Sequence, residues 1–226
     1  MPIVGFEYCS LHYLNQWLRN ERAFCEAIEA PVASQRLKAN SDAATFFRVA
    51  RNPPAQYEAA DGKQRYRPVL EILDSVKASD ISEKTVAASV EKVRSQISRS
   101  YGEKEVLSFT SKLMWVKLKS PVVIYDKRAR EALRTKAGDY ESYCSRWRET
   151  YQRYTRAIED ACKSLYKVRK YCADPTTATE QYISNVASAE WSKHGVFDIF
   201  LWSAGNAQQI APADGLTSAS LRRVRG

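Results

Sequence analysis

The chain has 226 residues, of which 44% are hydrophobic and 27% charged, and its 35 Lys and Arg residues against 26 Asp and Glu give a net charge of +9. This is the composition of an ordinary globular protein, and it excludes a collagen-like or wholly disordered chain. No stretch approaches the roughly 18 consecutive apolar residues of a transmembrane helix, and the N-terminus lacks the pattern of a secretory signal. We therefore expect a soluble cytoplasmic protein with no membrane partner.

The hydrophobic pattern is mostly helical, and we predict a mainly α fold. Residues 1–205 are expected to form a single helical domain, in which two helical subdomains flank a cleft, and residues 206–226 a flexible tail. In chain order, helices are predicted over residues 9–28, 43–47, 68–73, 83–97, 106–118, 127–133, 140–171, 179–189 and 196–202. The start at Ser41-Asp42 and the stop at Asn52-Pro53 follow from capping chemistry and from the missing amide donor of proline.

The segment 106–118 is apolar on nearly every side, which predicts a helix at the centre of the molecule. Lys112 is its unusual residue, because an ammonium in such a helix must reach water, pair with an acid or lose its proton. Burial favours the neutral amine, and a neutral lysine amine is a nucleophile. The alternative is a lysine whose ammonium reaches the surface past its apolar neighbours.

Asp126 is the second candidate, and its ordinary role is to cap the helix that starts at Lys127. It follows a short extended run that begins at Pro121, so its carboxylate can also be presented to a cleft. The capping and the functional interpretations are compatible.

The order of these features resembles the catalytic core of helix-hairpin-helix DNA glycosylases. Lys112 on an apolar helix, the link 121–125, Asp126 and a basic helix are most similar to bacterial 8-oxoguanine-glycosylase-like proteins, some of them encoded in phage-defence loci. The segment 197–202 resembles their closing helix. The Gly-x-Gly hairpin that usually precedes the lysine is replaced here by residues 107–111, and the interval between lysine and aspartate is shorter than in most of the superfamily.

The resemblance implies an enzyme that flips and excises a damaged or modified base from double-stranded DNA, near the nucleoid, without a cofactor or metal. A role against phage DNA with modified bases and a strand-cleaving lyase step are part of this expectation. Lys112 would attack the sugar and Asp126 would stabilise the positive charge that develops on it. The residues expected to contact the base are Trp115, Trp202 and Asp198. The ordinary role of each tryptophan would be packing in the core, and that of Asp198 would be to cap its helix or pair with another side chain within it.

The positive charge is concentrated between residues 127 and 170, where thirteen basic residues stand against six acidic ones. Such concentration favours a polyanionic partner, with a solvated basic helix face as the alternative. The residues expected to contact DNA phosphates are Lys127, Arg128, Arg130, Arg146 and Arg148.

Two other functions remain open. A non-catalytic nucleic-acid-binding protein would use the aromatic residues interleaved with the basic ones for base stacking, namely Tyr140, Tyr143, Trp147, Tyr151 and Tyr154. A helical module that binds an acidic protein partner is the third. The five cysteines have no CxxC pair and the two histidines no metal-type spacing, so reduced, buried thiols and no metal site are expected.

Overall fold

The computed structural model describes residues 4–53 and 64–206, and within these ranges the protein is helical and contains no β-strand. The mainly α prediction is confirmed. The expected tail 206–226 lies almost entirely outside the described residues. None of the described helices is long and apolar enough to cross a membrane.

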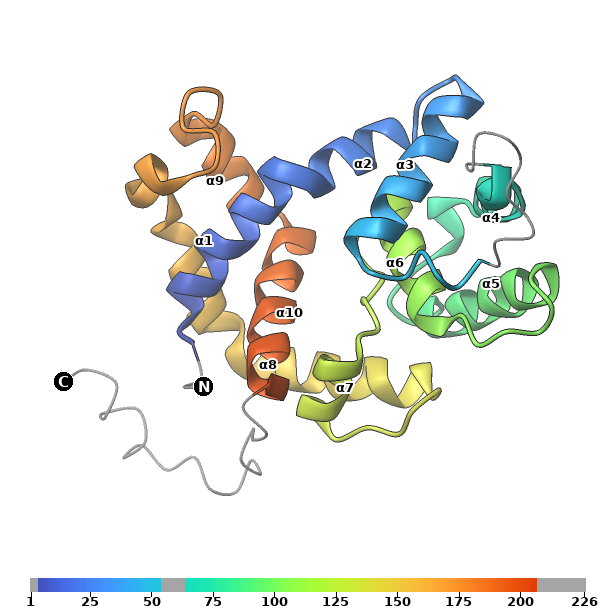
Figure 1. Cartoon of the computed structure of the whole chain (residues 1–226). Coiled ribbons are helices and arrows are strands. Elements are labelled where there is room, and N and C mark those ends of the chain that lie inside the picture. The colour runs from blue at the N-terminus through green and yellow to red at the C-terminus, as the bar shows by residue number, and fades with distance from the viewer. Residues whose placement is uncertain (1–3, 54–63, 207–226) are drawn as a thin grey trace.

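The molecule has two helical halves joined across the top by its N-terminal helices (Figure 1). The helix predicted at residues 9–28 is present as three consecutive pieces: α1 (Phe6–Gln16), a π-helical turn η1 (Trp17–Glu21) and α2 (Arg22–Ala27). The π turn was not predicted, because its one-residue widening leaves no signature in an otherwise helical pattern. α1 packs in one half, whereas α2 contacts α3 and α6 of the other.

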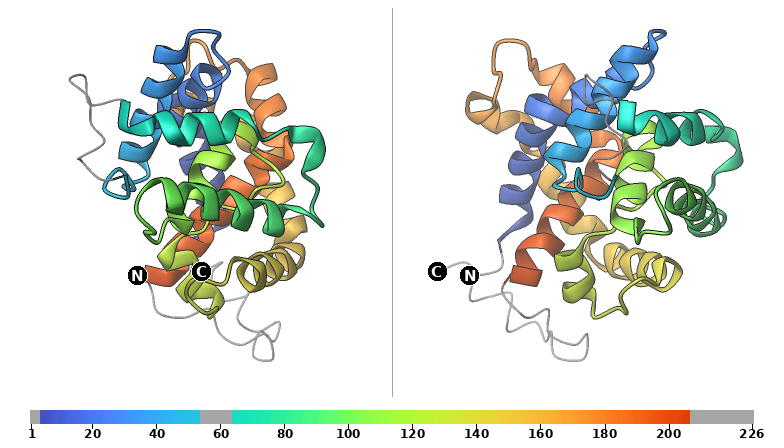
Figure 2. Two further views of the ribbon diagram at one scale, coloured as in Figure 1. Left: turned by 90° about the vertical axis from the view of Figure 1, so that its right-hand side faces the viewer. Right: turned by 45° about the vertical axis from the view of Figure 1, so that its right-hand side comes forward.

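The first half is built from α3, α4, α5 and α6, with α4 and α5 on its outer face (Figure 2). Their bounds are α3 (Ala33–Phe46), α4 (Arg67–Asp74), α5 (Val86–Ser100) and α6 (Leu107–Leu118), with short 3-10 turns at Gln64–Tyr66 and Ala78–Asp80. α6 is buried along nearly its whole length, which confirms the prediction of a central helix.

The second half packs α10 against α1, α7 and α8. Its elements are α7 (Lys127–Leu133), α8 (Tyr140–Lys163), the 3-10 helix η5 (Leu165–Tyr171), α9 (Glu180–Ser188) and α10 (Glu190–Asn206). Buried side chains of both halves form one continuous hydrophobic core.

Three predicted helix boundaries are wrong. α3 begins at Ala33, so Ser41 and Asp42 lie inside the helix, where Asp42 pairs with Lys38 one turn earlier and does not cap. The predicted end of that helix at Asn52-Pro53 is wrong as well, because α3 ends at Phe46. The helical stretch predicted over 140–171 is present, as α-helix up to Lys163 and as 3-10 helix from Leu165 to Tyr171. α10 begins at Glu190, because the polar turn before Val196 is helical as well.

Candidate active site

Lys112 and Asp126 lie together where the two halves meet. The Nζ atom of Lys112 is 3.4 Å from Oδ2 of Asp126 and donates to Oγ of Ser108 at 3.1 Å. The side chain of Lys112 is 7% exposed and that of Asp126 31%. The amine is thus enclosed by the protein, while the carboxylate that pairs with it reaches the surface.

The two oxygens of Asp126 have different partners. Oδ1 accepts a hydrogen bond of 2.9 Å from the backbone N–H of Arg128, which is the predicted cap of α7, and Oδ2 faces the amine of Lys112. Capping and pairing are therefore carried out by one carboxylate, as the sequence allowed.

Two serines on α6 hold the link that carries Asp126. Oγ of Ser108 donates to the carbonyl of Tyr125, and the N–H of Tyr125 donates to Oγ of Ser111. Both backbone groups of Tyr125 are thus satisfied by the helix that bears Lys112. Ser108 precedes Lys112 by one turn, so its hydroxyl lies on the same face of α6 as the amine.

Helix α8 fixes the same link from the other side. The hydroxyl of Tyr140 donates to the carbonyl of Val123 at 2.6 Å, and that of Tyr143 to the carbonyl of Ile124 at 2.9 Å. With Ser108 on the carbonyl of Tyr125, three consecutive carbonyls accept side-chain hydroxyls. The link is extended, and these three carbonyls and the N–H of Tyr125 are all hydrogen-bonded to side chains, which makes the position of Asp126 well defined.

The aromatic residues of α8 are therefore structural. Tyr140, Tyr143, Trp147 and Tyr151 are buried in the core, so the expectation that this stretch offers rings for base stacking is wrong. The physical reason is that α8 is amphipathic and turns these rings toward α10 and the link.

Burial is the main influence on the ionisation of Lys112. It lowers the pKa of the amine, and the nearby carboxylate of Asp126 opposes this shift. A lowered pKa increases the fraction of the amine that is unprotonated near neutral pH, which is the reactive form.

Asp198 of α10 is the second carboxyl group near the amine. Its Oδ1 accepts a hydrogen bond of 2.8 Å from the indole N–H of Trp147. Burial of the carboxyl group raises its pKa to about 8, with the negative charges of Asp126 and Glu21 adding to the shift. Asp198 therefore holds a proton at neutral pH and can donate as well as accept a hydrogen bond.

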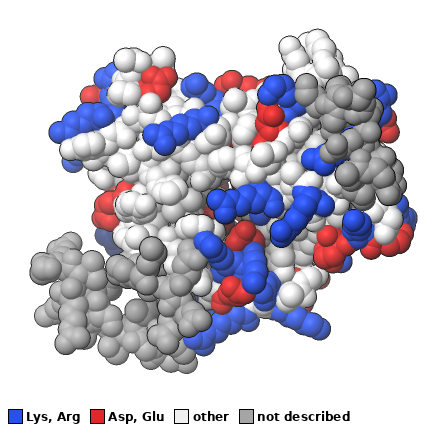
Figure 3. Space-filling model, in the orientation of Figure 1, with Lys and Arg blue, Asp and Glu red and all other residues white. Residues whose placement is uncertain are grey.

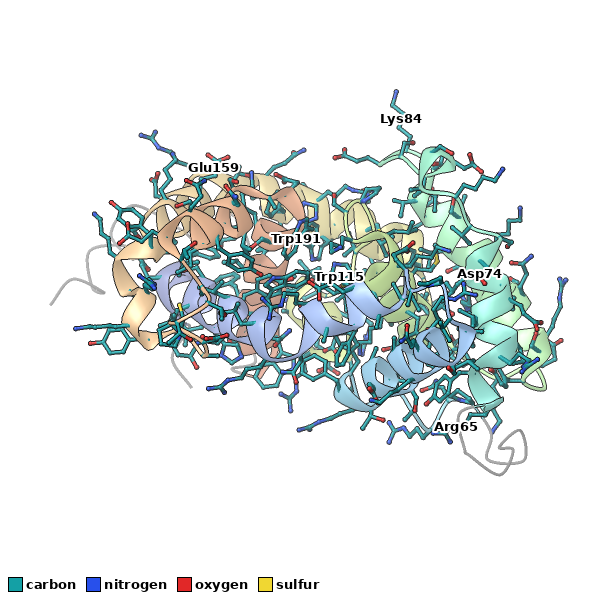
Figure 4. All side chains as sticks on the ribbon, turned by 90° about the horizontal axis from the view of Figure 1, so that it is seen from above. Arg65, Asp74, Lys84, Trp115, Glu159 and Trp191 are labelled. Carbon is teal, nitrogen blue, oxygen red and sulfur yellow. The ribbon has the colours of Figure 1, made fainter. Side chains whose placement is uncertain are left out.

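The predicted tryptophans have different environments. Trp115 is 2% exposed and packs in the core, toward the middle of the molecule in Figure 4. Trp202 is 46% exposed, and the guanidinium of Arg128 lies 4.3 Å above its ring. The ring of Trp202 therefore lies at the surface, one helical turn beyond Asp198. Its neighbour Arg128 is also the residue whose backbone N–H donates to Asp126.

Phe47 is an aromatic residue near the amine that sequence reasoning missed. It follows α3, is partly buried, and its ring centre lies 6.0 Å from Nζ of Lys112 and 6.4 Å from the ring of Trp115. The local sequence around Phe47 did not indicate this role, because its contact with Lys112 joins segments that are distant in the sequence.

Lys and Arg side chains gather at the middle of the face shown in Figure 3, between the two halves. Of the predicted phosphate contacts, Lys127 is 80% exposed at the start of α7 and Arg128 covers Trp202. Arg130 donates to the carbonyl of Thr135 and pairs with Glu131, so it is engaged within the protein. The two arginines of α8 that were predicted to contact phosphates have partners or are half-buried: Arg146 pairs with Glu149, and Arg148 is half-buried near Cys144.

Glu21 lies in the core near this site. It ends the π turn, is 1% exposed, and its Oε1 accepts a hydrogen bond of 2.6 Å from Gln16. Burial raises its pKa to about 7, although the hydrogen bond from Gln16 favours the carboxylate.

The wild-type protein should lose stability as the pH rises because of Glu21, and replacing Glu21 by glutamine should abolish this loss. The folded protein keeps the proton of Glu21 up to about pH 7, whereas the unfolded chain releases it near pH 4.5, so the wild type loses stability as the pH rises through this window. Between the two ends of the window, Glu21→Gln should gain on the order of 2 kcal/mol relative to wild type in urea unfolding. A difference between Glu21→Gln and wild type that stayed constant over this pH range would contradict the prediction.

The cysteines do not offer a second nucleophile. All five cysteines are buried and free, as expected, and burial raises the pKa of Cys9 and Cys25 to about 12 and that of Cys144 and Cys162 to about 11. Thiols with such values stay protonated and unreactive near neutral pH. The described residues contain no group of three His, Cys, Asp or Glu side chains that could hold a metal ion.

No family model matches this chain, and neither does any curated protein or solved structure.

Proposed function

We propose that the protein is a DNA glycosylase that excises a damaged or modified base and forms a covalent intermediate through Lys112. The observation that carries the proposal is the buried amine of Lys112, 3.4 Å from the carboxylate of Asp126, on two elements that a hydrogen-bonded link holds together. A resemblance to helix-hairpin-helix DNA glycosylases in the same residues supports it.

The chemistry needs a deprotonated amine and a fixed negative charge. Asp126 stabilises the positive charge that grows on the sugar as the bond to the base breaks. Nζ of Lys112 forms a bond to the anomeric carbon while the base leaves with the electron pair of the old bond and takes up a proton. The sugar ring then opens to an imine as the nitrogen loses a proton and the ring oxygen takes one up. Loss of a proton from the neighbouring C2′ expels the 3′ phosphate with the electron pair of its bond to C3′, and this cleaves the strand.

Two neighbouring groups suit a flipped-out nucleotide. Asp198, which is protonated at neutral pH, can donate a hydrogen bond to the base or a proton to the departing nitrogen. The ring of Trp202 is 46% exposed and carries Arg128 over one face, so it combines a stacking surface with a cation for a flanking phosphate, and the exposed Lys127 precedes Arg128 in the chain. An oxidised purine and a phage-type modified base are the substrate classes that the resemblance implies, in repair or in phage defence.

The test is to incubate the full chain with duplex DNA that contains an oxidised purine, with DNA from phages that carry modified bases, and with duplex DNA that contains an abasic site. Base release from one of the first two is expected. Borohydride should reduce the imine with the abasic site to a stable protein–DNA adduct. A protein that releases no base and forms no adduct with any of these substrates would overturn the proposal, and salt-sensitive DNA binding alone would favour a non-catalytic binding protein.

A further inference from the structure

A second basic and aromatic surface lies at η5, which follows α8. It carries two exposed lysines, Lys167 and Lys170. The other basic residues of the segment 163–173 are engaged within the protein, since Lys163 pairs with Asp160 and Arg169 donates to the carbonyls of Pro175 and Ala178. Tyr171 at its end is 60% exposed, and Nζ of Lys170 lies 5.0 Å from the centre of its ring.

Helix α1 continues this surface. Tyr8 is 56% exposed, and its ring centre is 5.7 Å from that of His12, which is exposed as well. Tyr8, His12 and Asn15 follow the spacing of one helix face. Asn15 donates to the carbonyl of Tyr171 and accepts from the N–H of Ala173, so the end of η5 is fastened to the same face of α1.

We name these five exposed residues, Tyr8, His12, Lys167, Lys170 and Tyr171, the tyrosine–lysine patch. It stands on α1 and η5, whereas Lys112 and Asp126 stand on α6 and at the start of α7, toward the other half of the molecule (Figure 1). The patch therefore does not take part in the site described above.

We propose that the tyrosine–lysine patch binds single-stranded nucleic acid. A ring exposed to this extent is a platform on which an unpaired base can stack, and lysines beside it place cations where the adjoining phosphates would run. A duplex offers its phosphates to such lysines but keeps its bases stacked on one another, so it cannot use the rings. An acidic peptide would use the lysines and leave the exposed tyrosines without a partner.

The test is binding of a fluorescently labelled oligothymidylate to the full chain, followed by anisotropy over a range of salt concentrations. The double variant Lys167→Glu/Lys170→Glu should weaken binding, and the salt dependence should flatten by about 1.4 in the log–log slope, the value for two lost phosphate contacts on a single strand. Tyr171→Ala should weaken binding by about fivefold or more, whereas Tyr171→Phe should bind as wild type, because phenylalanine keeps the stacking ring.

The matched control is Lys84→Glu/Lys92→Glu, which changes the net charge equally at two exposed lysines, with Lys84 at the far edge of the other half (Figure 4). It should bind nearly as wild type. Equal weakening by the control pair, or unchanged binding by the Lys167/Lys170 pair and Tyr171→Ala, would overturn the proposal. So would competition by polyglutamate or phosphatidylserine vesicles as effective as that by unlabelled oligothymidylate. Lys112→Gln should bind oligothymidylate as wild type does. The binding test is therefore independent of base excision, and its result stands even if the proposed glycosylase activity is disproved.

Discussion

Asparagine in place of Asp126 should slow base release by about 10²-fold or more while the protein still forms a borohydride-trapped adduct with a ready-made abasic site. Breaking the bond to the base requires stabilisation of positive charge on the sugar, which the neutral amide does not provide. The abasic site already carries an aldehyde, so its reaction with Lys112 needs only the free amine. Asp126 raises the pKa of Lys112, and its removal therefore leaves the amine more often unprotonated.

The substitution tests chemistry separately from folding. Asparagine caps helices as well as aspartate, so α7 keeps the hydrogen bond from the N–H of Arg128. Asp139→Asn is the matched control, since Asp139 caps α8 in the same way, through the N–H of Ser142 at 2.9 Å, and lies outside the candidate site. The control should release base at the wild-type rate. Equal losses in the two variants would assign the effect to capping and refute a catalytic role for Asp126.

The elements of this site were predictable from the sequence to different degrees. Local patterns sufficed for α6, because an apolar run that ends at proline has few alternatives, and for the cap at Asp126, because that chemistry is contained within one turn. The start of α3 was predicted wrongly, since Asp42 suits a cap and an ion pair within a helix equally well.

The pairing of Lys112 with Asp126 depends on contacts between helices. It was expected from a resemblance, and physical reasoning on the residues alone did not decide whether the amine would reach the surface. The hydroxyls that fix the link come from α6 and, far along the chain, from Tyr140 and Tyr143 of α8. Aromatic residues in a basic helix look the same whether they face solvent or the core. One signal was available in principle, because Ser108 and Ser111 interrupt an apolar helix on the side of Lys112.

Glutamine in place of Lys112 should abolish the borohydride-trapped adduct entirely, because the amine that forms the imine is gone. The fold should tolerate the change, since Asp126 is partly exposed and its carboxylate can be hydrated when the amine is absent. Urea unfolding of the variant checks this point. In the wild type, the rate of adduct formation should rise with pH, because only the unprotonated amine attacks, and the lowered pKa of Lys112 places this rise below the range of an ordinary lysine.

The control for Lys112→Gln is Lys117→Gln, on the same helix. Nζ of Lys117 donates to the carbonyl of Leu73 at 2.7 Å and lies 3.9 Å from Oδ1 of Asp74, and its side chain is 16% exposed. It is therefore another lysine held largely inside the protein, with partners other than Asp126. Lys117→Gln should form the adduct as wild type does. If Lys112→Gln formed it as well, the nucleophile would be another amine, with Lys119, the residue that follows α6, the first to replace. The reaction requires an amine with a lowered pKa and a carboxylate within reach. Lys112 has both, because burial lowers its pKa and Asp126 lies 3.4 Å from its amine.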